Sequence, residues 1–339
     1  MKEPKALLQR FLPLLLAMLL LAAAFRPHHE KKSRLRIVPG VWPAAEPLLV
    51  AGDLQVLPPN RFQIIEITWS SAVVRAFGSG AADVAVVTFD SVMRMREAGQ
   101  KLKVLKVLSK SEGADAVLAR PEIQRLQDLK GKRVGVERSA GSYLLANALE
   151  SVGMTMTEIE MVPMFQSEME PAIRARQVEA VVVTDPWLTK LTHNGTHSLY
   201  DSTQLKVPIT YLLVASERAC RSSREELVSL LQVQEKMAET IWAGKPFLGM
   251  DAVLRRENLD AAELSSCLGR LRRLNKAENA EMLKQLPQLA LQMEEQMIRA
   301  GIILSKPAGG AWIDDSFTKE ALPRSEEHTS ELQSRQCIS

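Results

Sequence analysis

Histidine and cysteine are scarce in this sequence, and their scarcity restricts the metal and redox chemistry it can support. Five histidines and three cysteines occur in 339 residues, and the spacing of Cys220, Cys267 and Cys337 matches no metal-binding pattern. His193 and His197 are four apart, but the Asn-Gly pair between them favours a turn. We therefore expect no metal site and no cofactor. In an exported protein Cys220 and Cys267 could pair, although nothing local requires it.

A large excess of charge of either sign is also missing. The chain has 43 basic and 40 acidic residues and a formal net charge of +3, without a stripe of lysine and arginine interleaved with aromatics. This pattern argues against a nucleic-acid partner. With 46% hydrophobic and 24% charged residues, the composition is that of a globular protein, and the length favours two lobes over one core.

The apolar run near the N-terminus is short for a membrane span. Residues 11–25 (FLPLLLAMLLLAAAF) are uncharged and mostly aliphatic, whereas a span needs about 20 such residues. Lysine and arginine precede the run, and Ala22–Ala24 offers a small-residue cleavage site. These features predict a signal peptide over residues 1–25 and an exported mature chain, with an uncleaved N-terminal anchor as the alternative.

The last residues differ from everything before them. Residues 324–339 (RSEEHTSELQSRQCIS) are polar and show no periodicity. They resemble a translated cloning or sequencing-adapter remnant. We expect a non-native tail there and leave it, with its cysteine, out of the fold.

Between these ends, predicted strands and helices alternate. Apolar runs such as 82–90 (ADVAVVTFD) and 178–187 (VEAVVVTDPW) indicate buried strands, and residues 224–301 show mostly helical periodicity. Such alternation predicts an α/β fold with two mainly parallel sheets flanked by helices. We expect lobe 1 to comprise residues 33–117 and 213–318 and lobe 2 residues 118–212, with crossings near 116–121 and 209–216.

Polar and aromatic residues follow several of the predicted strands. Ligands of such sheets bind at the carboxyl ends of strands, so we expect the loops after residues 35–40, 82–87, 132–136 and 180–184 to converge on one cleft. Trp42, in a loop with Pro43, could form an apolar wall for a small ligand there, with packing at the surface as the alternative, and Thr88 could face the cleft. Ser71 and Asp90 lie where helices are predicted to begin, so each could bind a ligand or simply cap its helix.

The stretch 133–153 (RVGVERSAGSYLLANALESVG) places small residues at the start of a helix. The free N–H groups and positive dipole end of a helix favour an anion, and Ser139, Ala140, Gly141 and Ser142 leave the backbone accessible. Glu137 before them could accept a hydrogen bond from a ligand or pair with a neighbouring cation. No GxGxxG or P-loop motif is present, so a small head group fits better than a polyphosphate. Capping without a ligand is the alternative.

The loop after residue 184 carries two further candidates. Asp185 can cap the helix that begins near Pro186, and Trp187 would supply a second aromatic side chain to the cleft. No nucleophile and base stand out as a pair, so we predict no catalytic residues.

Four segments together resemble a known family. GVWPAAEPLLVA, SSAVVRAFGSGAADVAVVTFD, GADAVLARPEIQRLQDLKGKRVGVERSAGSYLLANALESVGM and QVEAVVVTDPWLTKL are similar to substrate-binding proteins of bacterial ABC importers for nitrate, sulfonates and taurine, and to relatives that bind thiamine precursors. The resemblance covers about residues 33–250. It implies the bilobed type II periplasmic-binding-protein fold with a two-strand hinge, and an anion at residues 139–142. The ligand-lining positions that it implies are Trp42, Pro43, Ser71, Thr88, Asp90, Ser139, Ala140, Gly141, Ser142, Asp185 and Trp187.

The same resemblance implies a function and its partners. We expect an exported, periplasmic and monomeric protein that is not an enzyme, and that captures a small solute by hinge closure for an ABC permease in the inner membrane. The alternatives are a binding protein for a pyrimidine precursor of thiamine, a biosynthetic enzyme of the same fold, and a sensing ectodomain.

The candidate cleft is rich in acids. Four acids lie in or near the predicted loops: Asp90, Asp115, Glu137 and Asp185. Only two basic residues, Arg138 and Lys190, are close to them in sequence, so acids outnumber bases in this region. A solute with a positive or hydrogen-bond-donating part, such as taurine or an amino-pyrimidine, is therefore favoured over nitrate.

Overall fold

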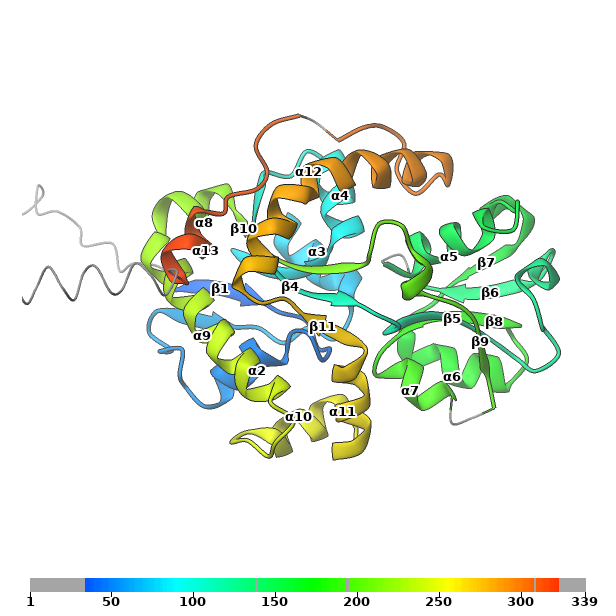
Figure 1. Ribbon diagram of the computed structural model, residues 1–339, viewed down its shortest axis with the longest axis horizontal. Helices are drawn as coiled ribbons and strands as arrows, with labels where there is room; N and C mark the ends of the chain where they lie inside the picture. Colours follow the sequence, from blue (N-terminus) through cyan, green and yellow to red (C-terminus); the bar gives the residue numbers. More distant parts are fainter. Residues whose placement is uncertain (1–33, 138–139, 193–194, 308, 323–339) are drawn as a thin grey trace, which may run out of the picture. The chain divides into compact units, whose positions relative to one another are not determined.

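The computed structural model describes residues 34–137, 140–192, 195–307 and 309–322. The predicted signal peptide and the predicted non-native tail lie outside these residues. Between 34 and 322 the chain forms two β-sheets, each flanked by helices (Figure 1). In the described part of the chain no helix is both long enough and apolar enough to cross a membrane.

The first sheet has six strands in the order β11-β4-β10-β3-β1-β2. Strand β1 pairs in parallel with β2 and β3, whereas β10 is antiparallel to both of its neighbours and β11 is antiparallel to β4. The bounds are β1 Leu35–Val38, β2 Phe62–Ile64, β3 Val84–Thr88, β4 Leu102–Ser111, β10 Thr210–Ser216 and β11 Leu271–Arg273.

The second sheet has five strands in the order β7-β6-β8-β5-β9. Strand β6 is parallel to β7 and β8, and β5 is antiparallel to β8 and β9. The bounds are β5 Asp115–Ala119, β6 Arg133–Val136, β7 Glu160–Pro163, β8 Ala180–Thr184 and β9 His197–Asp201.

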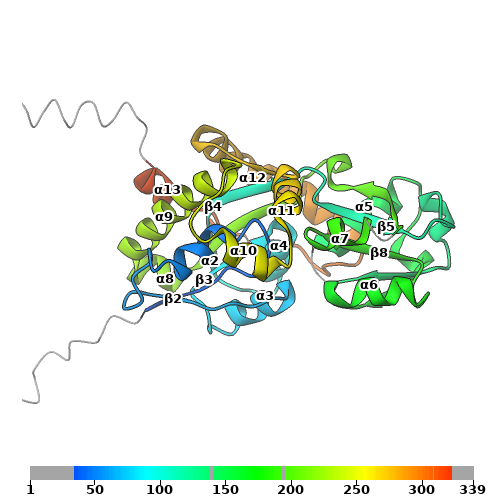
Figure 2. The ribbon, with the colours of Figure 1, turned by 90° about the horizontal axis from the view of Figure 1, so that it is seen from below.

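Helices cover both faces of the second sheet. Helix α5 lies on one face and α6 and α7 on the other (Figures 1 and 2). The helices of the described chain are α2 Glu46–Asp53, α3 Ser70–Gly78, α4 Phe89–Glu97, α5 Ala140–Glu150, α6 Gln166–Arg174, α7 Trp187–Thr192, α8 Glu217–Ser222, α9 Arg224–Trp242, α10 Met250–Glu257, α11 Ala261–Gly269, α12 Lys276–Arg299 and α13 Ser316–Ala321, with short 3-10 turns at Leu126–Leu129, Met156–Glu158 and Ser202–Gln204.

The alternation of side chains in β5 and β8 explains the two hydrophobic cores. Val117 and Val182 point to the α5 face and join a cluster that continues into the first sheet. Leu118 and Val181 point to the opposite face, where they pack with residues of α6 and α7 in a separate cluster. Both faces are therefore buried, which accounts for the nearly unbroken apolar runs of these strands.

The sheets are more mixed than the predicted mainly parallel arrangement. Between the named strands of the described residues, parallel pairing occurs in β2-β1-β3 and β7-β6-β8. The strands next to the points where the chain changes sheet pair antiparallel. The chain leaves the first sheet between β4 and β5 and returns between β9 and β10. The predicted lobe boundaries, 117/118 and 212/213, fall inside β5 and β10. The division of the chain into two lobes stays a prediction.

The two connecting segments touch each other at Ser202. Its hydroxyl lies 2.7 Å from Ser111 Oγ and accepts a hydrogen bond from the Gly113 N–H at 2.8 Å. Gly113 has a φ of +94°, a backbone conformation that favours glycine. The outward and the return connection are thereby joined by direct hydrogen bonds.

A short strand interrupts the mostly helical region predicted for residues 224–301. Helix α11 ends at Gly269, and residues 271–273 form strand β11, which pairs with Ser109–Ser111 at the edge of the first sheet. Pairing with β4, about 160 positions earlier in the sequence, satisfies the backbone N–H and C=O groups of these residues. The local periodicity of the sequence would instead have predicted hydrogen bonds within a helix. The correction matters because it fixes the position of Arg270.

Tyr143 offers a test of the packing between the second sheet and the C-terminal helices. Its side chain is fully buried, and its hydroxyl lies 3.1 Å from the Val207 carbonyl oxygen and 3.1 Å from Gln296 Oε1 of α12. We expect Tyr143→Phe to lower the free energy of unfolding by about 1 kcal/mol, measured by urea denaturation. Tyr200→Phe, which removes a weaker local bond to Gln204 at 3.3 Å, should cost less. Equal losses would contradict this account.

Candidate functional site

The candidate site is a cavity between the two sheets, lined by residues from both. The first sheet contributes the ends of β1 and β3 with Tyr211 of β10, and the second sheet contributes the end of β8 with Asp115 of β5. The carboxyl ends of the parallel strands thus face one space, as the predicted convergence of the four loops requires.

Five helices begin at this cavity. Because each helix follows directly after a strand or a short loop at the same edge of its sheet, its first turn faces the cavity. The lining residues in or next to these first turns are Ser70 of α3, Thr88 and Ser91 of α4, Ala140 and Gly141 of α5, Gln166 and Ser167 of α6, and Pro186 and Trp187 of α7. Backbone N–H groups and the positive ends of helix dipoles therefore surround the space.

Aromatic side chains form the cavity wall near Tyr211. The rings of Trp42 and Tyr211 are 6.4 Å apart between centroids, and Trp187 lines the cavity from the second sheet. The indole Nε1 of Trp42 is buried and has no hydrogen-bond partner within the described part of the chain. A buried N–H without an acceptor is unfavourable, so this donor is suited to a ligand oxygen.

Gly40 makes the position of Trp42 possible. It adopts a φ of +79°, and a Cβ placed on it would collide with the Trp42 ring. The glycine before the loop thus allows both the turn and the close approach of the indole to the backbone.

A second aromatic contact joins the two sheets beside the cavity. The rings of Trp69, before α3, and Phe165, before α6, stack with centroids 4.9 Å apart and an interplanar angle of 29°. Trp69 lines the cavity and is 43% exposed, so the stacked pair lies between the cavity and solvent.

Glu137 also bridges the sheets. Its side chain is 6% exposed, and its Oε1 accepts a hydrogen bond from Ser70 Oγ at 2.9 Å. Burial raises the pKa of Glu137, while hydrogen bonds from the Ser70 hydroxyl and the Ser71 N–H act in the opposite direction. The carboxylate thus occupies the start of α3, where a ligand anion would otherwise find N–H donors.

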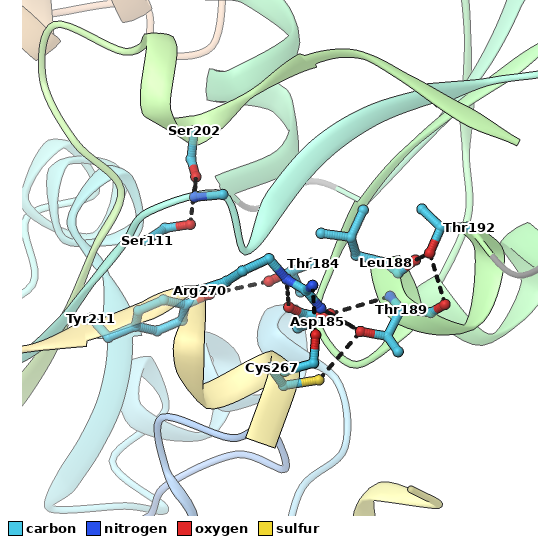
Figure 3. A network of polar contacts seen from close by, with 12 residues as sticks. Ser111, Thr184, Asp185, Leu188, Thr189, Thr192, Ser202, Tyr211, Cys267 and Arg270 are labelled. Atoms are coloured by element: carbon cyan, nitrogen blue, oxygen red, sulfur yellow. Dashed lines mark hydrogen bonds and ion pairs between the residues drawn. The ribbon is translucent and has the colours of Figure 1, made fainter. Parts of the chain in front are cut away.

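Asp185 is fully occupied by protein partners. Arg270, which follows α11, donates to its Oδ2 at 2.7 Å and its Oδ1 at 2.9 Å (Figure 3). Asp185 Oδ1 also accepts from the N–H and hydroxyl of Thr189, at 3.2 and 2.8 Å, and so caps α7 as predicted. This bidentate ion pair connects the C-terminal part of the chain to the second sheet.

Asp115 is the lining acid that the protein leaves incompletely paired. Its side chain is 3% exposed and lines the cavity, and its Oδ2 has no hydrogen-bond partner among the described residues. Burial raises the pKa of Asp115 to about 7, against the hydroxyls of Ser111 and Thr184, which lower it. The nearby carboxylates of Asp185 and Asp90 raise it further.

The structure brings together part of the predicted ligand-binding set. The predicted residues that line the cavity are Trp42, Thr88, Glu137, Ala140, Gly141, Asp185 and Trp187. Contact of any of them with a ligand stays a prediction. Ser139 lies outside the described residues.

Four predicted residues lie behind the cavity wall. Pro43 is buried in the turn before α2, and Asp90 is buried in an ion pair with Arg94 of the same helix. Ser142 donates to the Glu137 carbonyl oxygen at 3.4 Å, and Ser71 presents its backbone N–H to the Glu137 carboxylate. Each is therefore held by contacts within the protein and does not line the cavity.

Sequence reasoning missed Tyr211, Trp69 and Gln166 as lining residues. Tyr211 lies in an antiparallel strand, and its hydroxyl is 3.2 Å from Thr184 Oγ1 across the two sheets. Trp69 carried a usable signal, because an aromatic residue immediately before a helix that begins with two serines lies in a strand-to-helix loop.

Solved structures of the same fold are known. The chain is similar to the alkanesulfonate-binding protein SsuA from Xanthomonas axonopodis pv. citri bound to MOPS, with 21% identity and a TM-score of 0.63 over 80% of this chain and 96% of the other. It is also similar to the desulfurization enzyme DszB in complex with biphenyl-2-sulfinic acid, with 14% identity and a TM-score of 0.59 over 86% and 99% of the two chains. The predicted fold class, that of the two-lobed periplasmic binding proteins, is confirmed.

The family follows from the sequence match. The family model described as NMT1/THI5 like matches residues 61–243, more than half of the chain. The protein belongs to the NMT1/THI5-like family. A protein of Brucella abortus (strain 2308) described as a candidate binding protein is 29% identical over 114 residues, which are 33% of this chain and 35% of the relative. The match thus spans about a third of the length of the curated relatives.

The Glu137 bridge can be tested by a pair of variants. Glu137→Ala leaves the Ser70 hydroxyl and the Ser71 N–H without their acceptor, and we expect it to lower the free energy of unfolding by about 1–3 kcal/mol in urea denaturation.

Glu137→Gln keeps an acceptor and should cost less. Because burial raises the pKa of Glu137, this carboxylate stabilises the folded protein less as pH rises, so the neutral Gln variant should gain relative to wild type with rising pH. Equal losses for the two variants would contradict an acceptor role of Glu137.

Proposed function

We propose that the protein is an exported solute-binding component of an ABC importer that captures a small solute with a sulfonate-like oxyanion in the cavity between the sheets. The observation that carries the proposal is the convergence of helix first turns from both sheets on one cavity. The positive ends of helices stabilise an oxyanion without a basic side chain. None of the described lining residues is lysine, arginine or histidine.

The α5 first turn is the proposed position of the oxyanion. The start of α3 is already occupied by Glu137, and Asp185 caps α7. At α5, Ala140 and Gly141 line the cavity, and a methyl group and a hydrogen atom give the backbone little steric cover. Trp42 Nε1 supplies an additional unpaired donor on the opposite lobe. The binding of alkanesulfonate by the similar Xanthomonas protein supports this head group.

Hinge closure is the proposed mechanism of capture. A solute that contacts residues after β1 and after β6 bridges both sheets, so it favours the arrangement in which they are close. Delivery to a permease of the inner membrane, a periplasmic location and a monomeric state belong to the same proposal.

A binding role is proposed in preference to catalysis. Lining hydroxyls such as those of Ser70 and Thr88 have side-chain partners in Glu137 and Ser91, and no described lining residue offers an imidazole, amine or thiol to react or to activate them. The similarity to DszB concerns the fold.

A thermal-shift and calorimetry screen tests the function. We expect alkanesulfonates or taurine to raise the unfolding temperature, because a ligand selective for the folded state stabilises it, and nitrate and hydroxymethyl-pyrimidine to raise it less. Trp42→Phe removes one donor and should weaken sulfonate binding by about 5–10-fold.

Trp312→Phe is the matched control. Trp312 stacks on Phe89 and Arg96 and does not line the cavity, so its replacement should leave the affinity unchanged. The function would be refuted if no sulfonate bound, or if both tryptophan variants had the same effect.

A further inference from the structure

The four acids of the candidate cleft differ in the hydrogen-bond and ion-pair partners that the protein supplies to their carboxylates. Glu137 is bonded by Ser70, Asp185 by Arg270 and Thr189, and Asp90 by Arg94. Among the described residues, Asp90 Oδ1 and Asp115 Oδ2 are both buried without a hydrogen-bond partner, but only Asp115 lines the cavity. A buried carboxylate oxygen without a donor is costly, so the site is incomplete without a ligand.

The surroundings of Asp115 favour a positively charged donor. Its charged neighbours are the carboxylates of Asp185 and Asp90, and the uncharged groups that face it are Ser111, Thr184 and Tyr211. The hydroxyls of Ser111 and Thr184, which also contact Ser202 and Tyr211, interact with Asp115 but bring no positive charge. The cations nearest these acids, Arg270 and Arg94, are already paired with Asp185 and Asp90.

Other groups that line the same cavity favour a negative group. The first turn of α5 and the unpaired Trp42 Nε1 are hydrogen-bond donors. The same cavity therefore offers hydrogen-bond donors and an incompletely paired carboxylate, together with the aromatic surfaces of Trp42 and Tyr211.

We propose that Asp115 is the specificity-determining residue that selects an ammonium group, so that the solute is a small zwitterion with an oxyanion bound at α5 and an amine bound at Asp115. This inference rests on the proposed function and names the solute class of the same site. An ammonium supplies both the hydrogen bond and the charge that the pocket lacks.

Taurine and 1-propanesulfonate form a matched pair of probes, because they differ in an ammonium against a methyl group. We expect wild-type protein at pH 8 to bind taurine at least about tenfold more tightly in calorimetry, the effect of one charged hydrogen bond. Asp115→Asn should remove this preference by weakening taurine and strengthening propanesulfonate. Asp251→Asn, an exposed acid of α10, is the matched control and should preserve it.

The pH profile of the wild-type protein tests the same idea without a variant. Burial raises the pKa of Asp115 to about 7, so the free protein takes up a proton below that pH and must release it to bind an ammonium. Taurine affinity should fall by about tenfold from pH 8 to pH 6, whereas propanesulfonate affinity should not fall.

The outcomes separate the two proposals. Tight binding of both sulfonates without a preference, unchanged in Asp115→Asn and without the pH effect, would overturn the role of Asp115 and leave the solute-binding function intact. Absence of binding by either sulfonate to folded wild-type protein would overturn both.

Discussion

The site depends on one constraint: the carboxyl ends of parallel strands in two sheets face a single space. Strands β2-β1-β3 and β7-β6-β8 each end at this space, so the helices that follow them begin there. The same geometry that packs helices against each sheet therefore directs their N-terminal dipole ends at the cavity. Side chains such as Trp42 and Trp187 then shape a region whose polarity is already set by the backbone.

This backbone polarity also explains why buried acids accumulate around the cavity. Glu137 accepts donors at the start of α3, and Asp185 does so at the start of α7 with the help of Arg270. Acids that look in the sequence like partners for a cationic ligand are thus partly used to complete helix ends. Counting charges along the chain overestimates the positive charge that a ligand must bring. The contacts show that Asp115 is the cavity-lining acid with an unpaired oxygen.

Much of the fold could be predicted because it depends on local patterns. The apolar runs that form β3 and β8 and the serines that begin α3 were readable without coordinates. Arg270 and Tyr211 were not, because their roles depend on pairings between distant segments, β11 with β4 and β10 with β3. The locations of Asp90 and Pro43 behind the wall likewise depend on how side chains pack. The family model matches residues 61–243. This range includes most residues that line the cavity but not the segment that contains Arg270.

The contacts of Ser202 bear on the hinge closure that we propose. Its hydroxyl touches both the outgoing strand end at Ser111 and the backbone of Gly113, so the two strands of chain between the sheets form a single cross-linked joint. Two independent tethers would permit twisting as well as bending. If the protein closes on its solute as proposed, a joint tied at its centre would favour motion of the sheets about one shared axis and would keep residues on either side of the cavity aligned.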